Sequence, residues 1–413
     1  MKTVWIINQY ASTPATGIGG RHHYLARELA RLGHRVFLIG AGWHHLLQEN
    51  ETTAKALASE QIEGYTFVRV PVPRYATAHG KGRIRNWFLF RHRIWALRKA
   101  LPRPDTILYS SPALVPFGGA ARLARHFNAR LLFEVRDIWP LTLTELGGAT
   151  ARHPFIRYMQ RIENGAYRTC DAALSNLSHA ENHMLAHGLK PGRFTCVPNG
   201  ISAAEVASPV PLDTETTNAL PKQKFIIGYT GTLGLANKMN VLIDTAALLK
   251  DHTDIAFVLV GGGKDKAGLV QQAADLGLDN VTFIDPISKQ QVQSMIAHFD
   301  LCFLGTSKSP LYRFGLAANK LYDYMYASRP LLLSYSGAGD PATKYDAGLC
   351  VPAEDPDALA EAILALKSLP QTERDAMGKR ARDAVLTHHE FGALAIKLEG
   401  LLFPDLVTKG AEP

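Results

Sequence analysis

The feature that most constrains this fold is an alternation of short apolar runs with amphipathic segments, which occurs twice along the chain. The first half begins with "TVWIINQY", continues with the helical pattern of "RHHYLARELARLG" and returns to an apolar run in "RVFLIG". After residue 222 the alternation restarts with "KFIIGYTGT", "IAFVLVGGG", "NVTFIDPI", "DLCFLGT" and "RPLLLSYS". Because apolar runs separated by helices are typical of parallel strands covered on both faces, the sequence predicts two Rossmann-like α/β domains facing a cleft.

The chain of 413 residues is long enough for two domains. We expect the first over residues 1–200 and the second over residues 223–387. Residues 201–222 contain three prolines and no periodicity, which is typical of a linker. Residues 388–413 contain "HHEFGALAIKLEGLL", which predicts a final helix that packs back toward the first domain.

Composition excludes several classes of protein. The four cysteines form no C-x-x-C pair, so the sequence predicts neither a zinc site nor a disulfide framework, and a reducing cytoplasm fits best. The first residues lack the basic segment and cleavage site of a signal peptide. No apolar run approaches the roughly 20 residues that a membrane span needs.

Charge is distributed unevenly along the chain. Residues 1–200 contain 26 Lys and Arg against 12 Asp and Glu, a balance of +14. The remainder has 45−26=19 basic and 37−12=25 acidic residues, a balance of −6. Such a split indicates that the first half meets an anionic surface.

The basic charge is concentrated in "HGKGRIRNWFLFRHRIWALRKALPRP", which contains no acidic residue. Arginines interleaved with large aromatic residues are typical of an interfacial helix on anionic lipid. Nucleic acid is the rival partner, since aromatic rings also stack on bases, and a solvated basic helix whose rings face the core is the simpler alternative. We favour the membrane, and the candidate contact residues are Arg83, Arg85, Trp87, Phe88, Arg91 and Trp95.

Two loops of the first half follow predicted strands, where ligands bind in sheets of this type. The first contains Gly19 and Gly20 but has His22 in place of the third glycine of a dinucleotide fingerprint, so it predicts either a phosphate contact or a plain turn. The second is "EVRDIWP", in which Glu134 or Asp137 is placed to orient a substrate hydroxyl or accept its proton. The alternative for Asp137 is a helix cap.

Glycine-rich loops also follow strands of the second half. Gly231 precedes Lys238 at a predicted helix start, and backbone amides with an ammonium group are suited to a phosphate, although a solvated lysine beside an ordinary turn is equally compatible. Gly261 and Gly262 allow the backbone to approach a ligand closely. Ile287 lies in "DPIS", whose backbone is placed to pair with a base edge unless it only caps a helix.

The segment "YRFGLAANKLYDYM" predicts a loop that closes into a helix with Lys320 near its first turn. A cation is unfavourable there, because a helix N-terminus has partial positive charge. Lys320 therefore either pairs with Asp323, one turn later, or holds a bound anion together with the helix end. Since Lys238 also lies at a helix start downstream of glycine, the two lysines indicate a diphosphate.

Taken in order, "VPNGI", "YTGTLG", "LVGGG" and "NKLYDYMYASRPLL" resemble retaining GT-B glycosyltransferases of family four. "RDIWP" and "NKLYDYM" resemble the bacterial subgroup that adds N-acetylated amino sugars, such as N-acetylfucosamine, during O-antigen or lipopolysaccharide assembly. The resemblance implies an acceptor-binding first domain and a nucleotide-sugar-binding second domain. It also implies that the protein acts at the inner face of the bacterial inner membrane.

The resemblance assigns roles to individual positions. Lys320 matches the lysine that binds the donor pyrophosphate, with Asn319 and Leu321 beside it, and Asp323 stands where the family has the second glutamate of E-x7-E, which holds the ribose. The first glutamate of that motif is replaced by Gly315. Thr232 stands where the family has an accompanying arginine, and Lys238 matches the accompanying lysine. Asp137 stands where many members have a histidine or aspartate in the catalytic region.

The resemblance implies transfer of a sugar, an N-acetylated amino sugar from UDP, with retention, onto a lipid-linked or lipopolysaccharide acceptor. Lysines and helix amides stabilise a departing diphosphate without metal, and no acidic D-x-D run stands at a strand end, so we expect no metal and no cofactor. Two alternatives stay open: a sugar-nucleotide 2-epimerase of the same fold, and a nucleotide-sugar-binding scaffold without activity. The donor sugar, the base and the acceptor are not determined by the sequence.

Overall fold

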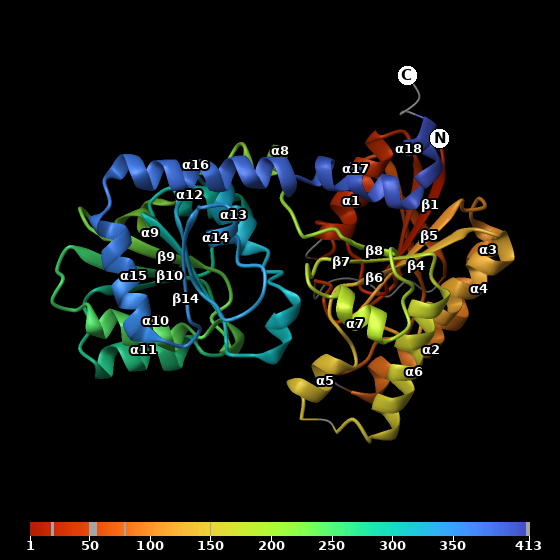
Figure 1. Cartoon of the computed structure of the whole chain (residues 1–413), viewed down its shortest axis with the longest axis horizontal. Coiled ribbons are helices and arrows are strands. Elements are labelled where there is room, and N and C mark those ends of the chain that lie inside the picture. The colour runs from red at the N-terminus through yellow and green to blue at the C-terminus, as the bar shows by residue number, and fades with distance from the viewer. Residues whose placement is uncertain (18–19, 49–55, 78–79, 149, 410–413) are drawn as a thin grey trace. The chain divides into compact units, whose positions relative to one another are not determined.

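A computed structural model describes residues 1–17, 20–48, 56–77, 80–148 and 150–409. The chain forms two compact units, one of Met1–Pro198 with Phe391–Pro413 and the other of Asn199–Glu390 (Figure 1). Each unit contains one mostly parallel sheet covered by helices, which confirms the predicted pair of Rossmann-like α/β domains.

The first unit is built on an eight-stranded sheet of order β3-β4-β2-β1-β5-β6-β7-β8. All neighbouring strands are parallel except β3 and β4, which form an antiparallel hairpin. The central strands are buried on both faces, as the apolar runs predict. The strands are β1 (Thr3–Ile7), β2 (Arg35–Ala41), β3 (Ala58–Ile62), β4 (Tyr65–Val70), β5 (Thr106–Ser110), β6 (Arg130–Val135), β7 (Ala172–Ser175) and β8 (Phe194–Cys196).

Helices cover this sheet in two groups. The helices α1 and α17 pack together, with the rings of Tyr24 and Phe391 stacked at 4.6 Å, so the last part of the chain is joined to the first unit. The helices α2, α4 and α6 pack side by side in the other group. The helices of the unit are α1 (Arg21–Arg31), α2 (Lys81–Arg93), η1 (Ile94–Ala96), α3 (Leu97–Ala100), α4 (Phe117–Phe127), α5 (Leu141–Glu145), α6 (Pro154–Thr169), α7 (Glu181–Ala186), α17 (Phe391–Leu402) and α18 (Pro404–Lys409).

The second unit has a six-stranded parallel sheet of order β11-β10-β9-β12-β13-β14. Its strands are β9 (Phe225–Thr230), β10 (Ile255–Val260), β11 (Val281–Ile284), β12 (Leu301–Gly305), β13 (Leu331–Ser334) and β14 (Gly348–Val351). Its helices are α8 (Ala203–Val206), α9 (Thr214–Ala219), η2 (Leu235–Asn237), α10 (Met239–Leu248), α11 (Lys266–Asp275), η3 (Lys289–Gln291), α12 (Val292–Ile296), η4 (Pro310–Phe314), α13 (Lys320–Tyr326), α14 (Pro341–Lys344), α15 (Pro356–Ser368) and α16 (Gln371–His388).

Four elements differ from the sequence expectation. The expected linker contains the short helices α8 and α9. The exposed edge strand β3 has no apolar run to reveal it. The helix α16 escapes detection because only a narrow stripe of small residues is buried, and Gly378 in this stripe packs so closely on the carbonyl of Ser328 that a Cβ atom would lie 2.0 Å from it.

Candidate active site

The site in the second unit is centred on Lys320, the first residue of α13. Its side chain is half-buried, and its ammonium group donates a hydrogen bond to the hydroxyl of Tyr229. Nζ also lies 3.9 Å from the centroid of the Tyr229 ring. Tyr229 is the second-last residue of strand β9, just before its glycine loop. These contacts therefore place Lys320 at the carboxyl edge of the sheet, where ligands of such sheets bind.

Glycines let the neighbouring loops approach this lysine. Gly231 has a φ of +135°, and a Cβ atom there would lie 2.8 Å from Nζ of Lys320. Gly261, with a φ of +147°, packs so closely that a Cβ atom would lie 1.9 Å from the carbonyl oxygen of Gly231. Both positions therefore exclude a side chain. The loops after β9 and β10 meet at Lys320, and the backbone of Gly262 accepts a hydrogen bond from Leu233 within the same cluster.

Lys320 has no carboxylate partner among the residues that the structure describes. Burial lowers the pKa of its ammonium group to about 7. Burial likewise raises the pKa of the half-buried Asp323 to about 6, against the opposing charge of Lys289. No ion pair joins Lys320 to Asp323 within the described chain, so the alternative of a simple surface ion pair is wrong. A bound anion would restore the charge of the lysine.

Lys238 lies between η2 and α10 in a left-handed conformation. Its ammonium group is 3.5 Å from Oε2 of Glu354, which follows β14. Oε1 of the same carboxylate accepts a hydrogen bond of 2.6 Å from the backbone of Lys308. That hydrogen bond comes first among the causes that lower the pKa of Glu354, followed by the charge of Lys238. Sequence analysis missed Glu354, since a single acid after a strand has no distinctive spacing.

The loop before α13 is fixed by Asn199 of the "VPNG" stretch. The amide of Asn199 donates to Oδ1 of Asn319 at 2.9 Å and to the carbonyl of Ala317 at 3.1 Å. Leu321 is only 3% exposed and packs in the core, so its side chain is unable to contact a donor. Ile287 packs partly buried against the same core.

Thr232 contributes its backbone to the cluster around Lys320. Its carbonyl oxygen accepts a hydrogen bond of 2.6 Å from the hydroxyl of Tyr229 and one of 3.0 Å from the amide of Asn237. These hydrogen bonds to the loop therefore fix the ring of Tyr229 beside Lys320. Tyr229 was not singled out from the sequence, because a tyrosine at the end of an apolar strand looks like part of the core.

In the first unit, Glu134 is the second-last residue of strand β6, near the carboxyl edge, and is fully buried. Its Oε1 accepts a hydrogen bond of 2.8 Å from Nε of Arg21, and its Oε2 lies 2.9 Å from Nε2 of His22. Burial alone would raise the pKa of Glu134, but Arg21 and His22 hold it well below the usual range. Burial also lowers the pKa of His22. The prediction that Glu134 accepts a substrate proton is therefore wrong, because both of its oxygens are engaged and enclosed.

Arg21 connects Glu134 with the backbone at the end of the first unit's main segment. Its Nη2 donates to the carbonyl of Val197 at 2.8 Å, and Nη1 donates to the carbonyl of Pro198. The ion pair thus joins α1, β6 and the end of the first unit. Gly20, with a φ of +77°, lets the chain turn into α1, while Gly19 lies outside the described residues.

Asp137 lies three residues beyond Glu134, and its side chain is exposed. It has no side-chain hydrogen bond to another described residue. The alternative of a helix cap is wrong, because Pro140 occupies the N-cap position of α5. Protein atoms crowd the carboxyl closely enough that reduced hydration raises its pKa, against the lowering effect of Arg136. The group is therefore available to a substrate.

The basic aromatic segment forms α2, η1 and α3, and its aromatic residues divide between core and surface. The membrane prediction is wrong for Trp87, which is 3% exposed and whose Nε1 donates to Oη of Tyr10 at 2.7 Å. Nε of Arg83 donates to the same hydroxyl at 2.9 Å. Phe88 remains 44% exposed, Trp95 is half-buried, and Arg85 and Arg91 are exposed. Membrane contact through these residues stays a prediction.

Two family models match the chain. Residues 16–200 match the glycosyl transferase 4-like domain, and residues 213–384 match the glycosyl transferases group 1. With the two parallel-sheet units, these matches define the chain as a GT-B glycosyltransferase. The protein belongs to the group 1, GT4-like glycosyltransferases.

Two curated proteins are similar in sequence. The "Putative colanic acid biosynthesis glycosyl transferase WcaI" of Escherichia coli (strain K12) is 25% identical over 312 residues, which span 72% of this chain and 74% of that protein. The D-rhamnosyltransferase WbpZ of Pseudomonas aeruginosa is 27% identical over 159 residues, which span 37% of this chain and 38% of that protein.

Solved structures share the fold at low identity. The sucrose-phosphate synthase of Thermosynechococcus elongatus superposes with a TM-score of 0.75 at 19% identity, covering 99% of this chain and 100% of that one. A glycosyltransferase of Rickettsia africae has a TM-score of 0.70 at 14% identity, with 98% of each chain covered. The Anabaena HepE protein, in complex with UDP and glucose, has a TM-score of 0.64 at 13% identity and covers 99% of this chain and 100% of that one.

Two further properties concern the residues that the structure describes. None of the helices there combines the length and apolar character that crossing a membrane requires. Within the same residues, no three or more His, Cys, Asp or Glu side chains are grouped so that they could hold a metal ion.

Proposed function

We propose that this glycosyltransferase moves an N-acetylated amino sugar from a UDP donor, with retention, onto a lipid-linked or lipopolysaccharide acceptor. The observation that carries the donor half is Lys320, a half-buried ammonium group without a carboxylate partner among the described residues. It stands against Gly231 at a sheet edge, where backbone amides and an ammonium group together suit a diphosphate. The UDP bound by the similar Anabaena protein supports the choice of nucleotide.

Lys320 has the main chemical role in this proposal. The bond between the anomeric carbon and the diphosphate oxygen breaks, and the acceptor oxygen bonds to the same face of the sugar. The acceptor proton passes to the departing diphosphate. Negative charge grows on the diphosphate during the step, and Lys320 stabilises it. Lys238 adds a second positive charge, which the carboxylate of Glu354 partly neutralises. These groups hold the diphosphate without a metal.

Two carboxylates complete the assignment. Asp323 holds the ribose hydroxyls, since it is half-buried on α13 and free of Lys320. Asp137 orients the acceptor hydroxyl, because it is the exposed acid at the edge of the first sheet. Glu134 acts only through Arg21 and His22, by fixing the backbone around that edge.

We place the acceptor at an anionic membrane surface, with the protein peripheral on the cytoplasmic face of the bacterial inner membrane. Exposed arginines of the first unit support this placement, and the two similar curated proteins carry names of bacterial glycosyl transferases. A nucleic acid partner is not part of the proposal.

A donor screen tests the function. UDP-, GDP- and dTDP-sugars are incubated with a polyprenyl-diphosphate acceptor, and products are identified by mass spectrometry. The expected result is one glycosylated lipid that appears only with a UDP-linked N-acetylated amino sugar. Donor converted to its 2-epimer without acceptor would identify an epimerase instead. UDP binding without consumption of any donor would identify a scaffold, and either outcome overturns the proposal.

A further inference from the structure

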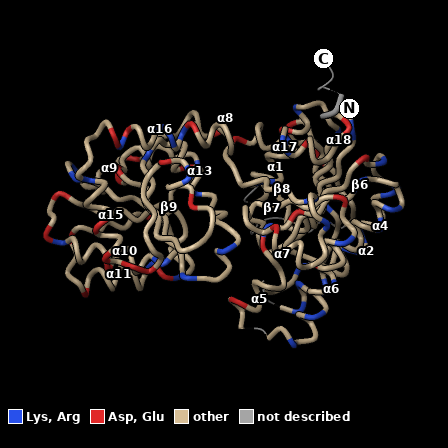
Figure 2. Tube along the Cα trace, viewed as in Figure 1, with Lys and Arg blue, Asp and Glu red and all other residues tan. Residues whose placement is uncertain are grey.

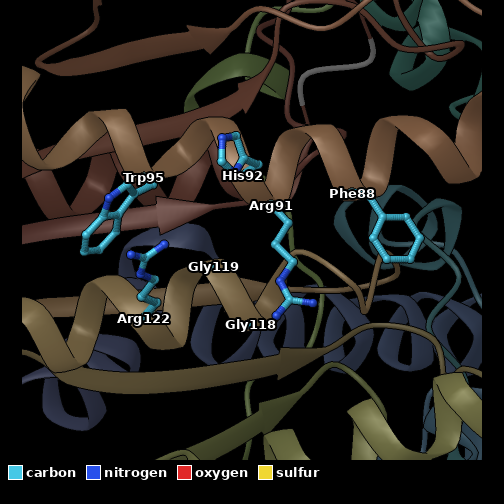
Figure 3. A pocket seen from close by; sticks show the side chains of 7 residues that line it. All are labelled: Phe88, Arg91, His92, Trp95, Gly118, Gly119 and Arg122. Atoms are coloured by element: carbon cyan, nitrogen blue, oxygen red, sulfur yellow. The ribbon is translucent and has the colours of Figure 1, made fainter.

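A small pocket lies on the first unit between α2 and α4. Its volume is about 280 Å³, and its lining includes Phe88, Arg91, Trp95, Gly118, Gly119 and Arg122. Figure 3 shows the guanidinium of Arg91 reaching from α2 toward Gly118, while Arg122 reaches from α4 toward Trp95. The two cationic groups therefore enter the same hollow from opposite helices.

Two adjacent glycines create this hollow. A Cβ atom at Gly119 would lie 2.6 Å from the carbonyl oxygen of Arg91, so its absence lets α4 approach α2. A Cβ atom at Gly118 would lie 3.0 Å from Cζ of Arg91, so the guanidinium rests directly on the helix backbone. Glycine is less favourable than alanine within a helix. The pair therefore maintains a shape that alanines would fill.

The two arginines are not neutralised by the protein. Neither Arg91 nor Arg122 forms an ion pair or side-chain hydrogen bond with another described residue, and the guanidinium of Arg122 only lies 3.8 Å from the ring centroid of Trp95. No acidic residue occurs in α2 or α4. Figure 2 shows Lys and Arg distributed along α2, α4 and α6. Two planar guanidinium groups in one concave site are suited to binding a phosphate group.

The surroundings indicate which phosphate. The volume of about 280 Å³ lies at the lower end of the range for small-molecule sites, which is enough for a phosphate-bearing headgroup. Phe88 is 44% exposed and lies one helical turn from Arg91, where an aromatic ring can enter the interfacial region of a bilayer. Trp95 carries both Arg98 and Arg122 over its ring, which disfavours stacking on a base.

We propose that this pocket binds the phosphodiester headgroup of an anionic phospholipid between Arg91 and Arg122. The inference rests on the proposed use of an acceptor at a membrane surface, and it makes membrane attachment depend on two specific guanidinium groups. Gly118, Gly119 and Arg122 belong to α4, which the sequence did not connect with the basic aromatic segment.

Charge-conserving variants test the proposal. The double variant Arg91→Lys with Arg122→Lys keeps both positive charges but removes both planar guanidinium groups. The matched control is Arg93→Lys with Arg125→Lys on the same two helices, outside the pocket lining. Binding is measured by co-sedimentation with phosphatidylcholine vesicles with and without phosphatidylglycerol, without donor or acceptor. We expect the pocket variant to bind phosphatidylglycerol vesicles about tenfold more weakly, and the control within about twofold of the wild type.

Three outcomes would overturn the inference. Equal binding by both variants would mean that attachment is only Coulombic. Failure of the wild type to prefer phosphatidylglycerol would mean that the pocket has no membrane ligand. Binding of soluble glycerol phosphate with the same affinity as vesicles would assign the pocket to a free metabolite. Thermal unfolding of both variants checks folding, and UDP binding, which the vesicle assay does not use, separates this failure from a failure of the proposed function.

Discussion

Replacing Lys320 by alanine should weaken UDP binding in a way that depends on pH. A charge-assisted hydrogen bond to the diphosphate contributes about 1.5–3 kcal/mol. With a pKa of about 7, only about a quarter of the free protein carries the proton at about pH 7.5, so charging the lysine costs about 0.8 kcal/mol. The remaining difference of about 1–2 kcal/mol corresponds to a loss of about 5- to 30-fold in affinity.

The pH dependence has a definite sign. The bound diphosphate raises the pKa of Lys320, so the complex binds more protons than the free protein above pH 7. The affinity of the wild type for UDP should therefore fall as pH rises, by up to about tenfold per pH unit. The Lys320→Ala variant has no such group and should lose this component of the slope, while titration of UDP itself is common to both proteins and cancels.

Isothermal titration calorimetry with UDP at several pH values measures both effects. Lys367→Ala is the matched control, because this lysine lies in the same unit but pairs with Asp254, which precedes β10 at the opposite edge of the sheet. The control should bind UDP within about twofold of the wild type at every pH. Equal affinity and equal pH slopes for the wild type and Lys320→Ala would refute the assignment of the diphosphate site.

Four further changes test neighbouring parts of the structure. Lys320→Met should raise the melting temperature of the ligand-free protein at neutral pH, since the unfolded state binds more protons there; a calorimetric scan measures this. Gly231→Ala should lower UDP affinity about tenfold or more in calorimetry, because its Cβ atom would displace the ammonium group of Lys320. Glu134→Gln should destabilise the protein to urea by about 3–5 kcal/mol by leaving Arg21 unpaired in the interior. Asp137→Asn should reduce kcat by up to about 10²-fold in the transfer assay while UDP affinity stays unchanged, because the acceptor hydroxyl is no longer oriented.

The second sheet was predictable because its strands are continuous apolar runs, such as β10, in which every residue is buried. The positions of the glycine loops were predictable for the same reason, since each loop follows a strand whose end the sequence reveals. Periodicity does not reveal contacts between residues that are far apart in the chain. The ring of Tyr229 under Lys320 joins residues 91 positions apart, and nothing local in either segment indicates that contact.

The first unit shows the same limit more strongly. Glu134 looked like a candidate base because it ends a strand, but its partner Arg21 lies 113 positions earlier in a helix that shows only an ordinary apolar face. A strand-end acid therefore does not reveal whether it is buried with a cation or open to substrate. The sequence likewise does not reveal whether Trp87 on α2 faces a membrane or the core. In the structure its indole donates a hydrogen bond to the hydroxyl of Tyr10 inside the unit.

The unmatched glutamate of the family motif can now be given a physical reason. Gly315 is buried and has a φ of +117°, a conformation that a glutamate would adopt only with strain. The loop that follows is held by the amide of Asn199, which donates to the carbonyl of Ala317 and to Oδ1 of Asn319. Gly315→Glu should therefore lower the melting temperature measured by calorimetry, because a side chain at a φ of +117° strains the backbone.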